Sequence, residues 1–244
     1  MVPHSPEWQR VRTFLAKNSF LGRLPDGVLD ALMRNGKIRR HTKGDIIFRR
    51  GEPGDSLLVL TSGQAKLTSI SPTAREIVMH FVGAGDVFGE TSALDGKERA
   101  VTAVALEDLE VFIIYSRDLL PTLTAHPGAM LAVVHALCET IRHGAAVIED
   151  NTLEMRGRMA RGLLRLARQH GRADGDRVSL ALTISQEDLG KYLDLSRANV
   201  SRQLGHLKTA GVLKIDGTEM TIVDADELAA IGEMTPARGA RRVG

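Results

Sequence analysis

The sequence predicts an α+β fold with an N-terminal antiparallel β-roll, a long central helix and a C-terminal domain of short helices and a β-hairpin. Three observations support this order. Between residues 37 and 115, short β-branched and aromatic runs alternate with glycine turns, which is typical of a β-roll or jelly roll. After Pro127, apolar residues recur at spacings of three and four, which indicates a long helix. Two short amphipathic runs and a hairpin pattern follow residue 184.

Length and composition limit the class of protein. The 244 residues suffice for two domains, and 43% hydrophobic with 25% charged residues is typical of a globular chain. No apolar run approaches the roughly 18 residues that span a bilayer, and the N-terminus lacks a signal pattern, so we expect a cytoplasmic protein without membrane contact. The single cysteine, Cys138, has apolar neighbours at helical spacing, which favours a buried structural thiol over a redox sensor.

Positive charge is concentrated in one C-terminal segment. Residues 156–214 hold twelve Lys and Arg against five Asp and Glu, whereas residues 1–155 hold seventeen against nineteen. Residues 215–244 hold three against six. This asymmetry indicates a polyanionic partner for the basic segment, although a solvated arginine-rich helix face would give the same count.

Residues 1–125 are predicted to form the roll domain. Helices are expected at 6–18 and 25–34, with a turn at Pro25-Asp26-Gly27 between them. The strands are expected at 45–48, 56–60, 65–70, 76–82, 100–105 and 109–115.

Residues 126–155 are predicted to form a dimerisation helix. The stripe that indicates a coiled-coil seam consists of Met130, Val134, Leu137, Ile141, Gly144, Ile148, Asn151 and Met155. A helix this long would expose its stripe beside a small roll, so a parallel homodimer through residues 127–155 is the simplest arrangement. Packing of the helix on its own roll is the alternative.

Residues 156–224 are predicted to form a winged helix-turn-helix domain, followed by an extension at 225–244. The expected elements are a helix at 156–170, a turn at 171–176, a strand at 178–184, helices at 185–193 and 196–210, and a hairpin of 212–215 and 220–223. A short helix is expected at 225–232, with a disordered tail after it.

The loop from residue 85 to 103 carries groups that suit a cyclic phosphate. A buried monoanion needs a permanent cation with a forked donor, which is arginine, here Arg99. Gly89 allows a tight turn whose backbone N–H groups can approach the anion. Glu90 offers a carboxylate acceptor for a ribose hydroxyl. An internal ion pair between Glu90 and Arg99 is the structural alternative.

The Phe88-Gly89-Glu90 … Arg99-Ala100 segment resembles the phosphate-binding cassette of cyclic-nucleotide-binding domains. With the downstream helix-turn-helix, the chain resembles the cyclic AMP receptor protein/FNR (CRP/FNR) family of bacterial transcription regulators over about residues 20–223. The resemblance implies that Glu90 holds the ribose 2′-hydroxyl and Arg99 the cyclic phosphate. The nucleotide site it implies consists of Gly89, Glu90, Thr91, Arg99, Ala100, Val101 and His143.

The choice between cAMP and cGMP rests on two departures from the family pattern. Ala100 stands where bacterial members often have Ser or Thr, and the Arg-Ala pair is more similar to the cassette of cAMP-dependent kinase regulatory subunits. At the place where a Thr-Ser pair contacts adenine in the best-known member, this chain has His143, which can donate or accept a hydrogen bond. The sequence favours cAMP and leaves cGMP open.

The chain lacks the residues that the metal-binding sensors of the family require. An iron–sulfur sensor needs several cysteines, and the haem type has Cys and His where this chain has Gly89 and Thr91. We therefore expect no metal, haem or iron–sulfur cluster. The sequence also shows no nucleophile–base pair and no Walker-type loop, so no enzymatic activity is predicted.

The helix-turn-helix pattern spans residues 185–210. Ser185, with Asp188 as its capping-box partner, and Ser196 are predicted to cap the two helices. The inward positions are Leu189 and Leu193 in the first helix and Val200, Leu204 and Leu207 in the second. The second helix is then expected to enter the major groove with its N-terminal end.

The DNA-binding residues follow from the resemblance and from side-chain chemistry. The family's Ser-Arg-Glu-x-Val-x-Arg motif is matched from Ser196 to Arg202, which implies base or phosphate contacts for Arg197 and Arg202. Ala198 replaces the usual glutamate, so we expect a changed or relaxed preference at that base pair. The predicted DNA-binding residues are Ser185, Ser196, Arg197, Ala198, Asn199, Ser201, Arg202 and Lys208.

Together these patterns predict a homodimeric regulator in which a cyclic nucleotide biases binding to a palindromic site on double-stranded DNA. RNA polymerase is a further expected partner. The alternative is a regulator of the same family that is constitutive or senses another signal. The sequence leaves open the operator and whether the protein activates or represses.

Overall fold

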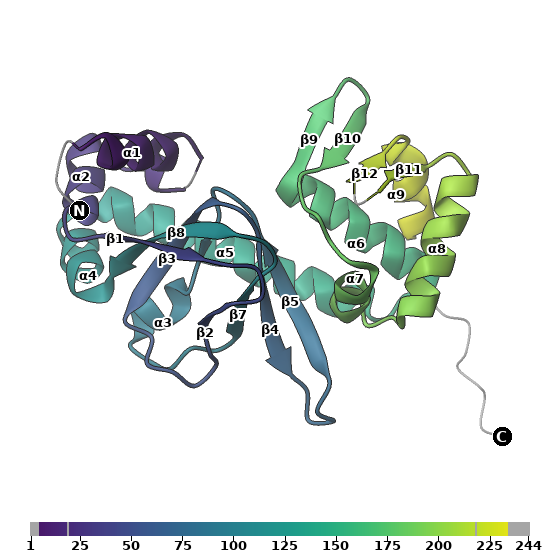
Figure 1. Cartoon of the computed structure of the whole chain (residues 1–244), viewed down its shortest axis with the longest axis horizontal. Helices are drawn as coiled ribbons and strands as arrows, with labels where there is room; N and C mark the ends of the chain where they lie inside the picture. The colour runs from purple at the N-terminus through teal and green to yellow at the C-terminus, as the bar shows by residue number, and fades with distance from the viewer. Residues whose placement is uncertain (1–4, 19, 218, 234–244) are drawn as a thin grey trace. The chain divides into compact units, whose positions relative to one another are not determined.

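The computed structural model describes residues 5–18, 20–217 and 219–233 (Figure 1). The chain divides into two compact units, Met1–Thr140 and Ile141–Gly244, and the division falls inside one long helix. The predicted domain limits at 125, 155 and 224 stay predictions. The predicted tail at 234–244 lies outside the described residues.

In the N-terminal unit, helices come before and after a run of eight strands along the chain. This order of elements agrees with the prediction. Helices α1 and α2 and every strand predicted in this unit are confirmed, with small shifts at their ends. The elements are α1 Pro6–Asn18, a 3-10 turn Phe20–Arg23, α2 Asp26–Arg34, β1 Lys37–His41, β2 Ile46–Phe48, β3 Ser56–Ser62, β4 Ala65–Ile70, β5 Glu76–Val82, β6 Val87–Phe88, α3 Glu90–Asp95, β7 Thr102–Ala105, β8 Leu109–Tyr115, α4 Ser116–Ala125 and the first part of α5 Pro127–Asp150.

The roll consists of two antiparallel four-stranded sheets, with orders β1-β8-β3-β6 and β2-β7-β4-β5. Side chains alternate along β3, because successive residues of a strand point to opposite faces. Leu58 and Leu60 pack inside the roll, whereas Leu57 and Val59 pack in the cluster that includes α1, α2, α4 and α5. The helices therefore cover the outer face of one sheet, and the other face encloses the roll interior.

Several elements of this unit are absent from the sequence prediction, namely the 3-10 turn Phe20–Arg23, β1, β6, α3 and α4. Strand β1 is rich in basic residues, which suits its place at a sheet edge. The same residues interrupt the β-branched and aromatic pattern by which the other strands were predicted. Strand β6 has only two residues. Helix α4 contains Pro121, which normally argues against a helix interior, yet Leu119 and Leu123 are fully buried and hold α4 on the core.

Helix α5 packs one face and exposes the other. Ala129, Ala132 and Val133 are buried in the helix-side core. By length and composition α5 could cross a membrane, with mean hydropathy 1.3 over 18 residues, of which 11% are buried. This finding corrects the expectation that no apolar segment is long enough to span a bilayer. Most of the exposed large apolar side chains of α5 lie on the predicted stripe, namely Met130, Val134, Ile141 and Ile148.

The predicted continuous helix through residue 155 is wrong. Helix α5 ends at Asp150, and α6 Met155–His170 begins after a turn. The Thr152 hydroxyl donates to the Glu149 carbonyl at 2.7 Å, and Arg158 Nη2 donates to the Leu153 carbonyl at 3.1 Å. These side chains satisfy carbonyl groups at the break between the two helices. Because α5 ends at Asp150, Asn151 and Met155 do not continue the stripe on α5.

The C-terminal unit has the predicted helix-turn-helix and wing. Its further elements are β9 Gly171–Asp174, β10 Arg177–Leu180, α7 Gln186–Leu193, α8 Arg197–Thr209, β11 Leu213–Asp216, β12 Glu219–Ile222 and α9 Ala225–Glu233. The sheet order is β11-β12-β10-β9. The turn predicted at 171–176 is wrong, because residues 171–174 pair with β10, and that strand ends at Leu180 rather than at 184.

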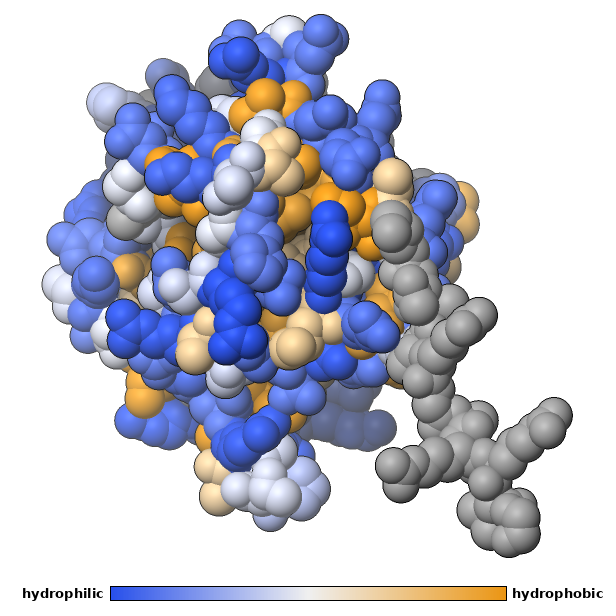
Figure 2. All heavy atoms as spheres, turned by 90° about the vertical axis from the view of Figure 1, so that its right-hand side faces the viewer, coloured by the Kyte–Doolittle hydropathy of each residue, from blue (hydrophilic) through white to orange (hydrophobic). Residues whose placement is uncertain are grey.

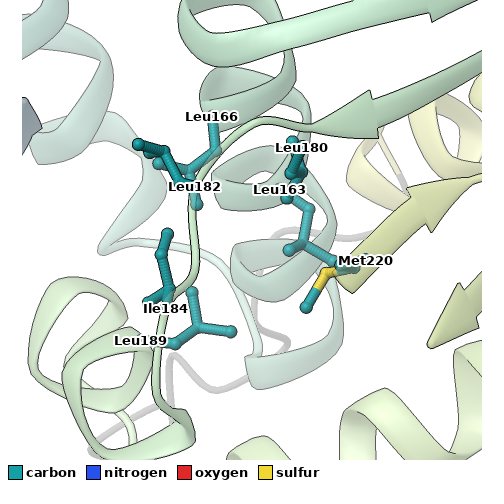
Figure 3. Close-up of a pocket in the computed structure, with 7 residues that line it drawn as sticks. All are labelled: Leu163, Leu166, Leu180, Leu182, Ile184, Leu189 and Met220. Carbon is teal, nitrogen blue, oxygen red and sulfur yellow. The ribbon is translucent and has the colours of Figure 1, made fainter. Parts of the chain in front are cut away.

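An apolar pocket lies inside this unit (Figure 3). Its side chains converge from α6, β10, α7, β12 and the segment that leads into α7. They are Leu163, Leu166, Leu180, Leu182, Ile184, Leu189 and Met220. The lining carries no charged group, so we interpret the pocket as part of the core that holds the helix-turn-helix.

Candidate functional sites

The cassette loop turns sharply at Gly89, directly before α3. Gly89 has φ +75° and serves as the N-cap residue of α3. A Cβ atom at this position would lie 2.6 Å from Arg99 Nη1. Glycine is therefore required for two reasons: the left-handed backbone conformation and the close approach of the arginine.

Arg99 lies under this turn with only 5% of its surface exposed. Its Nη1 donates to the Ser56 carbonyl at 2.7 Å and to the Gly89 carbonyl at 2.9 Å. Its Nη2 donates to Ser56 Oγ at 3.0 Å. All three acceptors are uncharged, so the structure contradicts the alternative of a direct ion pair with Glu90.

The Arg99 guanidinium keeps donors for a ligand. A guanidinium has five N–H groups, and three are used by the hydrogen bonds above. Nε is buried without a hydrogen-bond partner among the described residues, and one N–H of Nη2 is also left. Burial lowers the pKa of Arg99, against the opposing charges of Asp55, Glu52 and Glu90, but a guanidinium stays charged. The remaining donors suit two oxygens of one anion.

Glu90 begins α3 beside this arginine. Burial raises the pKa of its carboxyl, although the Glu90 backbone N–H, the Thr91 hydroxyl and the Arg99 charge each oppose the rise. The Thr91 hydroxyl donates to Glu90 Oε1 at 3.3 Å. A partly desolvated carboxylate without a full counter-ion is a strong acceptor for a ligand hydroxyl.

The structure brings the cassette residues together in one unit, and one further predicted residue belongs to the other unit. Gly89, Glu90, Thr91, Arg99, Ala100 and Val101 lie on one segment of the N-terminal unit that includes α3, with Ala100 exposed and Val101 partly buried. His143 belongs to the C-terminal unit, where its Nδ1 lies 3.1 Å from Gln169 Nε2. A contact of His143 with a base stays a prediction.

Two residues that sequence reasoning missed contact Arg99. The guanidinium carbon lies 4.4 Å from the centre of the Phe48 ring, and Ser56 supplies two of the three acceptors. Neither residue lies on the cassette loop. The pairing of β2 with β7 and of β3 with β6, on either side of the cassette, could have indicated them, but only once the register of the strands was known.

The two serine caps of the helix-turn-helix are confirmed. The Asp188 N–H donates to Ser185 Oγ at 3.0 Å, and the Ser185 hydroxyl donates to Asp188 Oδ2 at 2.7 Å. The Asn199 N–H donates to Ser196 Oγ at 3.2 Å. The Ser185 proton is thus already donated, whereas Ser196 uses only an oxygen lone pair and can still donate to a phosphate.

Helix α8 presents the predicted residues on its open side. Val200, Leu204 and Leu207 are buried, and Asn199 is partly buried. The exposed residues are Ser196, Arg197, Ala198, Ser201, Arg202 and Lys208. Figure 2 views the side on which α8 lies and shows a largely hydrophilic surface. This face combines two arginines with small residues, which suits close approach to a charged groove.

No metal site is seen in the described ranges. Residues 5–18, 20–217 and 219–233 hold no group of three or more His, Cys, Asp or Glu side chains that could bind a metal ion. Cys138, on α5, is partly buried, so the predicted burial of this thiol is found only in part.

Known proteins share both halves of this arrangement. The family model of the cyclic nucleotide-binding domain matches residues 38–126, and that of the Crp-like helix-turn-helix domain matches residues 157–231. A "CRP-like cAMP-activated global transcriptional regulator" of Mycobacterium tuberculosis is 28% identical over 77% of this chain and 84% of its own length. The "Cyclic AMP receptor protein" of Thermus thermophilus is 28% identical over 87% and 95%.

A solved structure confirms the fold. FixK2 from Bradyrhizobium japonicum superposes with a TM-score of 0.72 at 22% identity, over 82% of this chain and 98% of that one. The roll, its cassette and the helix-turn-helix define a DNA-binding transcription regulator with a cyclic nucleotide-binding domain. The chain belongs to the CRP/FNR family.

Proposed function

We propose that a cyclic nucleotide, with cAMP favoured over cGMP, binds the cassette and controls DNA binding by this regulator. The observation that carries the proposal is the Arg99 guanidinium, which is buried, held by neutral acceptors and left with donors for an anion. Glu90 lies at the start of α3 to accept from a ribose hydroxyl. The relative named for activation by cAMP supports the choice of ligand.

We further propose that the protein acts as a homodimer in the cytoplasm. Ile141 and Ile148 are each 71% exposed, and Val134 is 42% exposed, all on the predicted stripe of α5. A second copy of α5 would cover this stripe and remove its apolar surface from water. Two α8 helices could then read half-sites about 34 Å apart on a palindromic site. RNA polymerase is the further partner proposed for the bound dimer.

Nucleotide would control DNA binding by favouring one arrangement of the dimer. The coupling free energy equals the difference in nucleotide binding free energy between the arrangements that bind DNA well and poorly. Equal affinity for both arrangements would give no control, however tight the binding.

The test is calorimetric titration of the purified protein with cAMP and, separately, with cGMP. We expect micromolar or tighter binding of at least one nucleotide and loss of that binding in Arg99→Ala, with the dimer still folded. Unchanged affinity in Arg99→Ala would overturn the site. No heat with either nucleotide, on folded protein free of ligand, would support the alternative of a constitutive regulator or one that senses another signal.

The dimer is tested separately. We expect Ile141→Asp and Ile148→Asp to shift the protein to a monomer in analytical ultracentrifugation, because each places a charge in the stripe. Leu131→Asp is the control, since Leu131 is 58% exposed but lies outside the stripe. A dimer that persists in both stripe variants would contradict the proposed interface.

A further inference from the structure

We propose that Phe48 and Ser56 are positioning residues that hold Arg99 ready for the nucleotide phosphate and thereby set nucleotide affinity. The inference rests on the proposed function, since it assigns these residues to the same site. Both lie on roll strands rather than on the cassette loop.

Phe48 supplies a flat support for the guanidinium. The Arg99 Cζ atom lies 4.4 Å from the centre of the Phe48 ring, within the range of a cation–π interaction. The Phe48 ring stacks in turn on Phe88, with ring centres 5.9 Å apart and planes 30° apart. Phe48 and Phe88 are 8% and 1% exposed. A support built of two packed rings in the roll interior leaves the guanidinium little freedom to tilt.

Ser56 fixes the direction of the guanidinium within its plane. Its carbonyl and its hydroxyl oxygen accept from Nη1 and Nη2, the two terminal nitrogens of Arg99. The Ser56 hydroxyl donates to Asp55 Oδ1 at 3.1 Å, which leaves its oxygen lone pairs to accept from Arg99. Strand β3 is itself fixed, because Ser56 pairs with Tyr115 at the end of β8.

These two contacts decide which donors remain for the ligand. With both terminal nitrogens engaged, the Nε side of Arg99 is left to bind an anion. Long arginine side chains lose rotamer freedom when they bind, and a guanidinium already held in place loses less. Phe48 and Ser56 therefore act on the nucleotide through Arg99 and need no contact with it.

The first experiment removes the ring of Phe48. We expect Phe48→Leu to weaken cAMP binding by about tenfold in calorimetry, as for loss of a largely desolvated cation–π contact. Phe112→Leu is the matched control, because Phe112 is also buried in a roll strand but packs in the other core cluster. It should lower the melting temperature without this loss of affinity.

A double-mutant cycle shows whether Phe48 acts through Arg99. In an Arg99→Lys background, which keeps a positive charge but lacks the planar fork, we expect Phe48→Leu to add little further loss. Ser56→Ala should also weaken binding, and Ser56→Thr, which keeps the hydroxyl, should restore it.

The outcomes separate the two proposals. Binding of cAMP or cGMP by the wild type, with the same affinity in Phe48→Leu and Ser56→Ala, would overturn the positioning roles and leave the proposed function standing. An equal loss from Phe48→Leu in the wild-type and Arg99→Lys backgrounds would also overturn positioning through Arg99. No binding by the folded wild type would overturn both proposals.

Discussion

Asp150, the last residue of α5, forms an ion pair at 2.6 Å with Arg161 Nε of α6, across the turn that joins the two helices. The same carboxylate also accepts a hydrogen bond from Arg165 Nη1. Arg165 Nε donates to the Tyr192 hydroxyl of α7 at 2.7 Å. One buried carboxylate therefore connects the end of α5 to the first helix of the helix-turn-helix.

We predict that Asp150→Asn destabilises the C-terminal unit by roughly 3 kcal/mol, because the arginines lose a carboxylate that is 3% exposed. Urea unfolding measures the change. Glu149→Gln is the control, since Glu149 is 69% exposed and lies 3.5 Å from Arg161, and we expect about 0.5 kcal/mol or less. Similar losses in both variants would show that the buried position of Asp150 has no special importance.

Gly89 and Gly96 give a matched pair for the cassette turn. Both have left-handed backbone, with φ +75° and +72°, so alanine should cost each a similar strain of about 1 kcal/mol. Only at Gly89 would the new Cβ meet Arg99, because nothing lies within 4 Å at Gly96. We therefore expect Gly89→Ala to weaken nucleotide binding far more than Gly96→Ala in calorimetry. Equal affinities would contradict the close approach of Arg99.

Glu90 makes the stability of the ligand-free protein depend on pH. Burial raises the pKa of its carboxyl above the ordinary 4.5, so the folded chain binds this proton more tightly than the unfolded chain. The stability due to the protonated form is complete below pH 4.5 and is lost as pH rises through the folded pKa.

Glu90→Gln cannot ionise and should avoid this loss. We expect the variant to be more stable than the wild type at neutral pH, with the difference shrinking toward pH 4, as measured by thermal unfolding. Its nucleotide affinity should fall, because an amide is a weaker acceptor than a carboxylate. A stability difference that is constant across this pH range would contradict the raised pKa.

The cassette and the helix-turn-helix could be predicted because their residues are close in sequence. Gly89, Glu90 and Arg99 lie on one segment, and the cap of α8 by Ser196 involves Asn199, three residues away. Local spacing determines such contacts, so a single sequence is sufficient to propose them.

The features missed depend on contacts between distant parts of the chain. The stacking of Phe48 on Arg99 needs the register of β2 and the cassette, and α4 forms despite Pro121 because its leucines are buried. The end of α5 was also missed, because the apolar spacing continues to Met155 while Asp150 instead pairs with arginines of α6. Tertiary contacts outweigh local pattern in each case.

Arg202 and Lys208 allow base reading to be separated from phosphate binding. Both are exposed on α8, with Arg202 nearer the end that enters the groove. We expect Arg202→Ala to cost about 1–3 kcal/mol and to relax specificity at one base pair, because arginine can read guanine through two hydrogen bonds. Lys208→Ala should weaken binding to all sequences alike and lower the salt dependence of binding.

Binding of both variants to a panel of operators with single base-pair changes, at two salt concentrations, distinguishes the roles. The wild type and Arg202→Ala should differ in their order of preferred sites, whereas the wild type and Lys208→Ala should share one order. A uniform loss in Arg202→Ala across the panel would mean that Arg202 contacts only phosphate. Base recognition would then be left to the N-terminal turn of α8, where Arg197 is the one long cationic side chain between Ser196 and Ser201.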